Sequence, residues 1–434
     1  MSSRRALSLL RALDPAETLF WLFDRVSSMN FAIIAEGEGV LAREALQEAL
    51  DRLQARHPLL RAGITRTDAG ELAFFHSDAA IGLERGEVDT WLDDAIARRM
   101  VEPFGLDQGP LVRAHHFVNR PETWCLVLVF HHSIADGRAG CGLMLELLRD
   151  LAGDAREDGE VAGMALQALL DERWAGESGQ ARLDSLRAMR KAEFRATGRP
   201  SDQAGFQIRG EHFHPTFVRL HLAEAEVLAL ARVARRHGAS VHGALGAAQL
   251  LALWRRFGGH DRRVLSLTSP VDLRPRLAGA GEGVSLLTSL LTVSVALDPG
   301  RSFWELAAAL TSTLREQLAR GDGEAFYRLM PSGAEHAASE LGVASFATLW
   351  STMPQASLLS NVGRIDASIE SPTFALKHLS FALCPMPNQP VFSAVTTFNG
   401  AMTINLNYDA ASWEPAAFAA FVHDVETGLK AALA

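Results

Sequence analysis

The sequence contains few cysteines and no dense tract of basic residues. Cys125, Cys141 and Cys384 are an odd number of cysteines without CxxC spacing, which favours a reducing compartment and no disulfide framework. The net charge of −9 at pH 7 argues against a nucleic-acid-binding protein. Hydrophobic residues make up 48% of the chain and charged residues 21%, as in an ordinary globular protein. The length of 434 residues predicts about two to three domains.

Long hydrophobic runs are also absent. No stretch approaches the roughly 20 apolar residues that are needed to span a bilayer. Residues 1–13 resemble a signal peptide faintly, but Arg11 and Asp14 interrupt the apolar stretch and no small-residue cleavage site follows. We therefore expect a cytoplasmic protein without a membrane span.

Several common catalytic and metal-binding motifs are missing. The chain has no Gly-x-Ser-x-Gly, no Gly-x-Gly-x-x-Gly and no Walker A sequence. The pair His115-His116 has neither cysteine partners nor a His-Glu-x-x-His frame, so we expect no metal site.

The most informative segment present is His-His-Ser-Ile-Ala-Asp-Gly, residues 131–137. It follows an uncharged run, residues 124–130, that is typical of a strand buried on both faces. A strand end holds side chains rigidly, and histidine is well suited to transfer protons near neutral pH. Gly137 tolerates unusual backbone angles, which indicates a shaped turn. We expect the chemistry to take place here.

Helix and strand patterns alternate in two halves of similar length. The segment between them is rich in Gly, Ala and charge, and residues 182–195 within it predict a solvated helix. Asn399-Gly400 predicts a two-residue hairpin turn late in the chain. The expected divisions are an N-terminal lobe (1–175), an inter-lobe connection (176–210) and a C-terminal lobe (211–434).

The turn and this order of elements resemble the coenzyme-A-dependent acyltransferase superfamily. That group includes chloramphenicol acetyltransferase, condensation domains of nonribosomal peptide synthetases, plant acyltransferases and polyketide-associated acyltransferases. Its signature His-His-x-x-x-Asp-Gly is matched without departure by His131, His132, Asp136 and Gly137. Three further segments resemble motifs of the family and occur in the same order along the chain: residues 56–61, 270–275 and 360–363.

Two departures narrow the resemblance. The Asp-Phe-Gly-Trp-Gly motif of the plant branch is absent, and so is the late Arg/Asn-rich motif of peptide condensation domains. The nearest members are therefore free-standing polyketide-associated or alcohol O-acyltransferases.

The resemblance implies an α/β fold of two lobes, each a mixed sheet flanked by helices, with a tunnel between the lobes and the signature histidine midway along it. It implies transfer of an acyl group from acyl-CoA or an acyl carrier protein to a hydroxyl, in natural-product or lipid biosynthesis. The phosphopantetheine thioester is then the donor substrate, no cofactor is bound permanently, and an acyl carrier protein is a candidate partner.

By the same resemblance His132 is the general base that deprotonates the acceptor. Asp136 either orients His132, as in a catalytic triad, or braces the turn; the family favours a brace, with Arg274 as the ion-pair partner.

Three further residues shape the expected site. His131 holds the turn or takes part directly in catalysis, and Gly137 gives room for the substrate. Asn361 is a candidate contact for the oxyanion or the acceptor, and a plain turn asparagine is the alternative.

The signature does not record the acceptor atom, so a condensation-like N-acyltransferase that forms an amide is an alternative. A non-catalytic docking module that recruits a partner is the alternative from another class. The intact His132 argues against such a module, which has no need for it.

Overall fold

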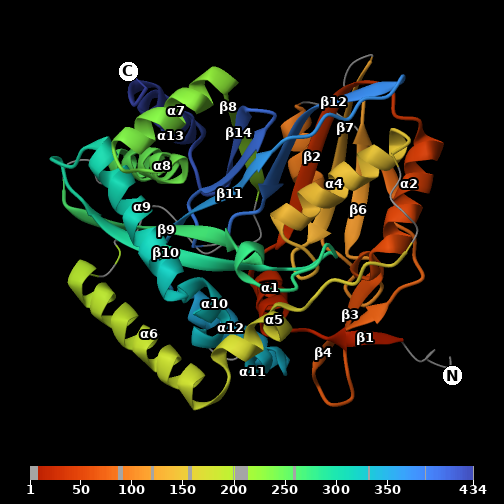
Figure 1. Ribbon diagram of the computed structural model, residues 1–434, viewed down its shortest axis with the longest axis horizontal. Helices are drawn as coiled ribbons and strands as arrows, with labels where there is room; N and C mark the ends of the chain where they lie inside the picture. Colours follow the sequence, from red (N-terminus) through yellow and green to blue (C-terminus); the bar gives the residue numbers. More distant parts are fainter. Residues whose placement is uncertain are drawn as a thin grey trace.

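The structure is a computed structural model that describes residues 8–86, 91–118, 122–154, 159–198, 200, 214–257, 261–330, 333–386 and 388–433. Strands within these residues form sheets of five, six and three strands, with helices packed on their faces (Figure 1). This arrangement confirms the expected α/β fold of mixed sheets flanked by helices.

The five-stranded sheet has the order β12-β2-β7-β6-β5. Its strands are β2 (Asn30–Gly39), β5 (Leu83–Gly86), β6 (Val112–Phe117), β7 (Thr123–His131) and β12 (Phe374–Leu383). Helices α2 (Arg43–Arg56) and α4 (Gly137–Leu151) cover one face, and α3 (Leu92–Val101) packs on the other.

Strand β7, which leads into the His-His turn, is buried on both faces, as its uncharged sequence predicts. Leu126 and Leu128 belong to the apolar cluster that contains α4, whereas Val127 and Val129 pack with α3. Side chains of a strand alternate between the two faces, so only a strand covered on both sides needs an unbroken apolar sequence.

The six-stranded sheet has the order β10-β9-β11-β13-β14-β8. Its strands are β8 (Pro215–Leu222), β9 (Arg263–Asp272), β10 (Thr288–Leu297), β11 (Ser357–Ile365), β13 (Phe392–Phe398) and β14 (Ala401–Asp409). A second apolar core fills the space between this sheet and its helices, which are α7 (Glu224–Arg236), α8 (Val241–Phe257), α9 (Phe303–Arg320) and α13 (Pro415–Ala431).

The hairpin predicted at Asn399-Gly400 is confirmed. Strands β13 and β14 pair in antiparallel register on either side of it. Both turn residues have positive φ, 47° at Asn399 and 89° at Gly400, as a type I′ turn requires.

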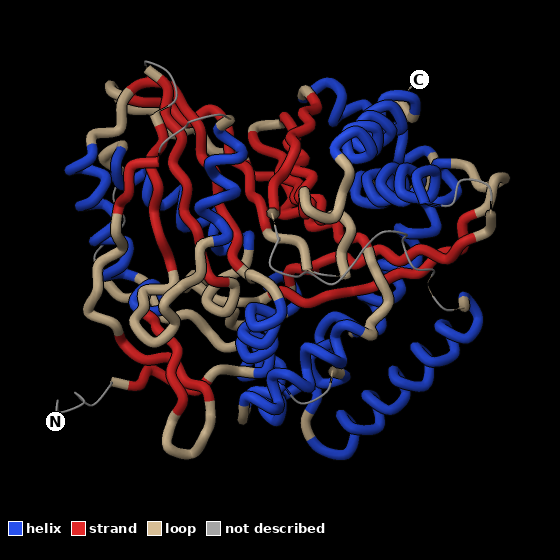
Figure 2. The backbone as a smooth tube through the Cα atoms, turned by 180° about the vertical axis from the view of Figure 1, so that it is seen from behind, coloured by secondary structure: helices blue, strands red, loops and turns tan. Residues whose placement is uncertain are grey.

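Smaller elements complete the molecule. A three-stranded sheet of order β1-β4-β3 lies at one end, beside α1 (Figures 1 and 2). The remaining elements are β1 (Leu9–Ala12), α1 (Pro15–Val26), η1 (Pro58–Arg61), β3 (Ala62–Arg66), β4 (Leu72–His76), α5 (Leu166–Trp174), α6 (Gly176–Thr197), η2 (Arg274–Arg276), α10 (Asp322–Leu329), α11 (Gly333–Ala337) and α12 (Glu340–Ser351).

One strand of the second half of the sequence belongs to the sheet of the first half. β12 comes from the second half but pairs with β2 along its whole length in the sheet of the first half. The sheets therefore do not divide the chain at the expected connection, residues 176–210, although α6 does begin there. The later part of that connection, residues 201–210, lies outside the described residues. The lobe boundaries themselves stay a prediction.

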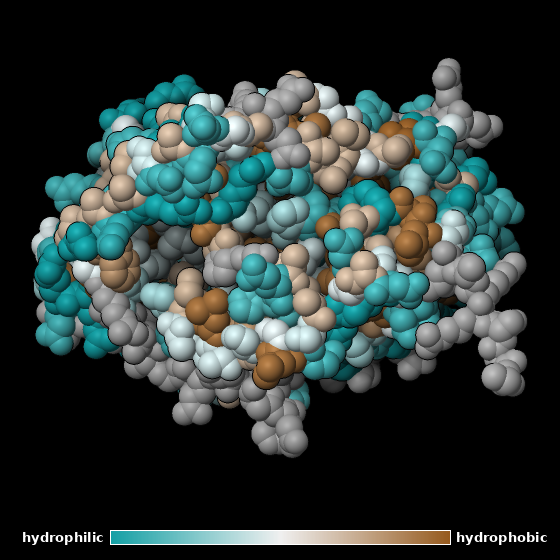
Figure 3. Space-filling model, turned by 90° about the horizontal axis from the view of Figure 1, so that it is seen from below, coloured by the Kyte–Doolittle hydropathy of each residue, from teal (hydrophilic) through white to brown (hydrophobic). Residues whose placement is uncertain are grey.

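On the face seen in Figure 3, hydrophobic residues occur in small separate groups among hydrophilic ones. No helix in the described part of the chain is both long enough and apolar enough to cross a bilayer.

One ion cluster joins the two large sheets. Arg219 of β8 pairs with Glu36 of β2, and its Nη2 lies 2.6 Å from Asp93 Oδ1 of α3. The Arg219 side chain is only 13% exposed, so its charge depends on these two carboxylates.

We predict that Arg219→Leu lowers the free energy of unfolding by about 3 kcal/mol, because it leaves two half-buried carboxylates side by side without a cation. Urea denaturation of the purified proteins measures this difference. The matched control is Arg364→Leu, since Arg364 and Asp366 pair on the surface with both side chains more than half exposed, and an exposed pair contributes little to stability. Equal losses in the two variants would contradict the role given to Arg219.

Candidate active site

The His-His turn lines a large cavity. The cavity has a volume of about 770 Å³, and residues from both halves of the chain form its walls. His132, Asp136 and Gly137 contribute from the turn, while strands β9, β10 and β11 contribute from the six-stranded sheet. That the cavity continues as a through tunnel stays a prediction.

The position of the turn follows from the elements on either side of it. β7 ends at His131 and α4 begins at Gly137, so the turn is held between a buried strand and a helix N-terminus. The Asp136 carboxylate caps this helix, since its Oδ1 accepts a hydrogen bond of 2.9 Å from the Ala139 N–H.

His132 is a buried imidazole packed between aromatic rings. The centroid of the Phe20 ring lies 4.2 Å from that of His132, with an interplanar angle of 27°, and the Phe31 ring lies at 4.9 Å. Burial lowers the pKa of His132 to about 4, because the charged imidazolium loses its water. The imidazole is therefore neutral at physiological pH and can accept a proton.

The hydrogen bonds of Asp136 lead away from His132. Its Oδ2 lies 2.9 Å from Arg274 Nη1 and accepts a hydrogen bond of 2.8 Å from the Leu287 N–H. Arg274 also donates to Asp272 Oδ1 and to the carbonyl oxygen of Ser285. The structure thus brings Asp136 and Arg274 together in the geometry of a brace, and the functional role of the pair stays a prediction.

His131 is not among the residues that line the cavity. Its Nδ1 accepts a hydrogen bond of 3.2 Å from the Ser133 N–H, which leaves the proton on Nε2 in the neutral ring. Nε2 lies 3.5 Å from Asp24 Oδ2. Its contacts are those of a residue that holds the turn.

Helix α1 contacts three consecutive turn residues, 131–133, through one face. The contacts come from Asp24, from the ring of Phe20 and from the carbonyl oxygen of Glu17, which accepts a hydrogen bond of 3.0 Å from the Ser133 hydroxyl. These three helix positions are spaced i, i+3 and i+7, which is one side of an α-helix. Sequence analysis missed this contact, because nothing in the helix pattern says what the face packs against.

Gly137 has an ordinary backbone conformation, and its lack of a side chain leaves room for a neighbouring strand. It is not among the glycines with positive φ, which corrects the expectation from the sequence. A Cβ built on it would lie 3.2 Å from Val362 Cγ1, closer than ordinary contact. The missing side chain allows β11 to approach the first turn of α4.

Asn361 lies within strand β11, where its pairing with β13 becomes irregular, and not in a plain turn. Its Oδ1 accepts a hydrogen bond of 2.9 Å from the Gly363 N–H, and Asn361 is not among the residues that line the cavity. Its neighbour Ser360 lines the cavity instead. The two residues are adjacent in β11, where successive side chains point to opposite faces. The predicted contact of Asn361 with the oxyanion or the acceptor therefore has no support from its position.

The predicted solvated helix at residues 182–195 lies within α6, and it does more than face solvent. Arg190, Glu193 and Phe194 of this helix line the cavity.

Among the residues that the structure describes, no group of three or more His, Cys, Asp or Glu side chains could hold a metal ion.

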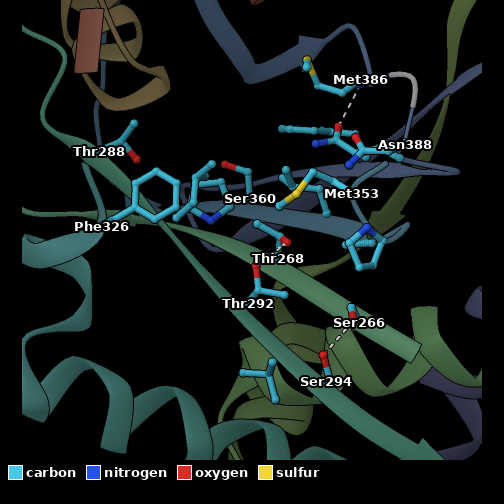
Figure 4. A pocket seen from close by; sticks show the side chains of 18 of the residues that line it. Ser266, Thr268, Thr288, Thr292, Ser294, Phe326, Met353, Ser360, Met386 and Asn388 are labelled. Carbon is cyan, nitrogen blue, oxygen red and sulfur yellow. Dashed lines mark hydrogen bonds between the residues drawn. The ribbon is translucent and has the colours of Figure 1, made fainter. Parts of the chain in front are cut away.

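The cavity walls differ in chemical character. Phe20 and Phe31 pack against His132. Further apolar residues line the cavity, namely Phe23, Met29, Trp350, Met353, Phe381, Leu383, Met386 and Phe392. A second wall, formed by β9 and β10, carries hydroxyl groups, as Figure 4 shows for Ser266, Thr268, Thr292 and Ser294.

Several known sequences are similar to this chain. Residues 211–407 match the family model described as phthiocerol/phthiodiolone dimycocerosyl transferase C-terminus. The chain is 28% identical over 331 residues to the phthiocerol/phthiodiolone dimycocerosyl transferase of Mycobacterium leprae, a match that covers 72% of this chain and 74% of that protein. A shorter match of 109 residues, 32% identical, covers 25% of this chain but only 2% of tyrocidine synthase 3 of Brevibacillus parabrevis.

Solved structures share the fold over nearly the whole chain. Polyketide synthase associated protein 5 from Mycobacterium tuberculosis has a TM-score of 0.70 at 18% identity, with coverage of 98% of this chain and 99% of that one. The first condensation domain of the CDA synthetase has a TM-score of 0.72 at 16% identity, with coverage of 98% and 96%. At these identities the likeness shows the fold alone. Together with the sequence matches, it supports the resemblance to the coenzyme-A-dependent acyltransferase superfamily that the His-His-x-x-x-Asp-Gly turn indicates.

Proposed function

We propose that this acyltransferase moves an acyl group from a thioester of coenzyme A or an acyl carrier protein to a hydroxyl acceptor, in natural-product or lipid biosynthesis. The observation that carries the proposal is the neutral, buried imidazole of His132 on the wall of a large cavity. The curated relatives named as dimycocerosyl transferases support the class of reaction. A thioester donor is supported by the starter condensation domain of rhizomide synthetase, which has this fold and was solved in complex with C8-CoA.

The reaction needs a base at the acceptor. The neutral imidazole of His132 takes the proton from the hydroxyl as its oxygen attacks the thioester carbonyl, and a C–O bond forms. The C–S bond then breaks, and the leaving thiolate recovers the proton from the imidazolium. General-base help of this kind accelerates a reaction by about 10²–10⁴-fold.

The surroundings of His132 suit this role. The Phe20 and Phe31 rings fix the orientation of the imidazole, while its Nδ1 has no hydrogen-bond partner in the described residues. The apolar wall next to it offers a place for the hydrocarbon of the acyl group, where contact with the aromatic and methionine side chains removes apolar surface from water.

The direct test is a thiol-release assay with acyl-CoA donors of different chain lengths and with alcohols or amines as acceptors. We expect release of free coenzyme A that depends on an alcohol. Release that depends only on amines would favour the amide-forming alternative. Absence of release with every acceptor would favour a non-catalytic docking module.

We predict that His132→Ala lowers kcat for acyl transfer by about 10²–10⁴-fold, because the base is lost while the cavity remains. The control is His116→Ala, since His116 lies in β6 and does not line the cavity. Near-normal turnover by the His132→Ala protein would refute the assigned base.

We predict that kcat/KM stays level from pH 8 down to about pH 5 and falls only as the pH approaches 4. The pKa of His132 is lowered, to about 4, so the imidazole becomes protonated and loses its function as a base only near that pH. Initial rates between pH 4 and pH 8 measure this, with circular dichroism at each pH to verify that the protein is folded. An acid limb with its midpoint near 6.5, the value of an ordinary histidine, would show that His132 is not buried as described.

We predict that Asp136→Ala lowers the free energy of unfolding by about 3–5 kcal/mol, since it leaves the Arg274 cation and the Leu287 N–H without their buried partner. Urea denaturation measures the loss, and Asp366→Ala is the control, because Asp366 pairs with Arg364 on the surface and both side chains are more than half exposed. An Asp136→Ala protein as stable as the wild type but without activity would instead support a triad in which Asp136 orients His132.

A further inference from the structure

Three aromatic side chains meet where helix α12 packs against α1 (Figure 1). The ring centroid of Phe23 on α1 lies 4.6 Å from that of Trp350 and 5.7 Å from that of Phe346, and the two α12 rings lie 6.1 Å apart. We call these three residues the aromatic cluster. Phe23 and Trp350 line the cavity, whereas Phe346 contacts both rings without lining it. Phe346 therefore forms a second layer of the wall.

Helix α1 connects the aromatic cluster to the His-His turn. Phe20 and Phe23 are three positions apart, so they lie on the same face of α1. The Phe20 ring stacks on His132 with 4.2 Å between centroids, and it meets the Phe23 ring edge-on at 5.9 Å. Less than one turn of helix thus separates the ring at the imidazole from the ring in the cluster.

The charged residues of the cavity lining lie in another direction. Outside the turn they belong to α6 and α9, and they are Arg190, Glu193 and Glu316. The lining residues of α1 and α12 are all aromatic, namely Phe20, Phe23 and Trp350. A hydrocarbon chain is stabilised when it leaves water for apolar surroundings, so its favourable direction is toward α1 and α12.

The aromatic cluster closes the cavity in this direction. Phe23 and Phe346 are each only 3% exposed, and the ring of His336 lies 5.7 Å beyond Phe346. Phe346 is the single fully buried residue of α12, which is described throughout, so it anchors this helix. A smaller residue in place of Phe23 would extend the cavity as far as Phe346. An apolar void of this kind stays dry and binds apolar ligands.

We propose that Phe23 sets the longest acyl chain that the enzyme transfers, with Trp350 as the neighbouring part of the same wall. The inference rests on the proposed transfer from a thioester and identifies a specificity-determining residue of that site. An acyl chain whose carbonyl carbon lies at His132 extends along α1 until its end contacts the aromatic cluster. A longer chain is excluded, because a close-packed core resists displacement of its rings.

The test measures kcat/KM for straight-chain acyl-CoA donors that differ by two carbons, with one alcohol as acceptor. For the wild type we expect kcat/KM to rise with chain length, because each further methylene is buried, and to fall beyond an optimum. Phe23→Ala should move the optimum to a longer donor. The ratio of kcat/KM for that donor over the wild-type optimum should rise about tenfold, the gain expected for burial of two further methylene groups.

Phe23→Leu carries the same test if circular dichroism shows that Phe23→Ala does not fold, since leucine keeps most of the apolar contacts. Its ratio should rise about fourfold, the gain for one methylene group. The matched control is Phe421→Leu, which shortens a fully buried ring of α13 that does not line the cavity, and its optimum should equal that of the wild type.

An unchanged optimum in the folded Phe23 variants would overturn the proposal. So would an optimum that moves in Met353→Ala but not in Phe23→Leu. Met353 lines the cavity and is 39% exposed, so the chain would then run past it toward solvent and not along α1.

Calorimetric titration with alkyl-CoA thioethers separates this proposal from the proposed reaction, because a thioether binds without being transferred. Affinity for the longest thioethers that is about tenfold higher in Phe23→Ala than in the wild type supports the role of Phe23 even if no ester forms. Affinity that does not increase with chain length in either protein would contradict it.

Discussion

The Asp136 carboxylate is the contact on which the geometry of the site depends. With two oxygens it caps α4, accepts the Leu287 N–H at the start of β10 and pairs with Arg274 of η2. A single buried group thereby connects the His-His turn of one sheet to the first residues of the other. Without it the Leu287 N–H would lose its acceptor and Arg274 would keep only Asp272 and the Ser285 carbonyl, so this carboxylate connects the two walls of the cavity.

The catalytic proposal follows from the burial of His132, which removes its imidazole from water. His132 is stacked on Phe20 and its pKa is lowered by burial, so the proton-free form that a base requires is the stable one. The hydrogen bonds of Asp136 go to Ala139, Leu287 and Arg274, which is not the arrangement of a triad in which it would orient the imidazole. Orientation comes from aromatic packing and from α1, which contacts the turn at three successive residues.

Much of the fold and the turn could be predicted from the sequence, because the signals are local. The uncharged residues 124–130 indicated a strand buried on both faces, and Asn399-Gly400 indicated the hairpin; both depend on neighbours in the chain. The pairing of β12 with β2 in the five-stranded sheet could not be predicted, since pairing between residues more than 300 positions apart leaves no local pattern. The family resemblance pointed to Arg274 as the partner of Asp136, a pairing that composition and periodicity alone do not contain.

The expectations that the structure did not support also have physical reasons. Asn361 was chosen from a motif, but strand alternation turns its neighbour Ser360 into the cavity. Residues 182–195 have the charge of a solvated helix, yet Arg190, Glu193 and Phe194 of that helix line the cavity, since its position depends on the tertiary fold. The Phe20 contact depends on which helix packs beside the turn, and this is settled only by the tertiary fold.

The central claim is that a neutral, buried His132 faces the acceptor in an acyl-transfer site. The measurement that tests it most directly is an NMR titration of protein labelled with ¹³C at histidine, assigned with the His132→Ala variant. The account predicts that the His132 resonance titrates near pH 4 and shifts at neutral pH when an acceptor alcohol is added. A resonance that titrates near pH 6.5 and does not respond to any acceptor would contradict it.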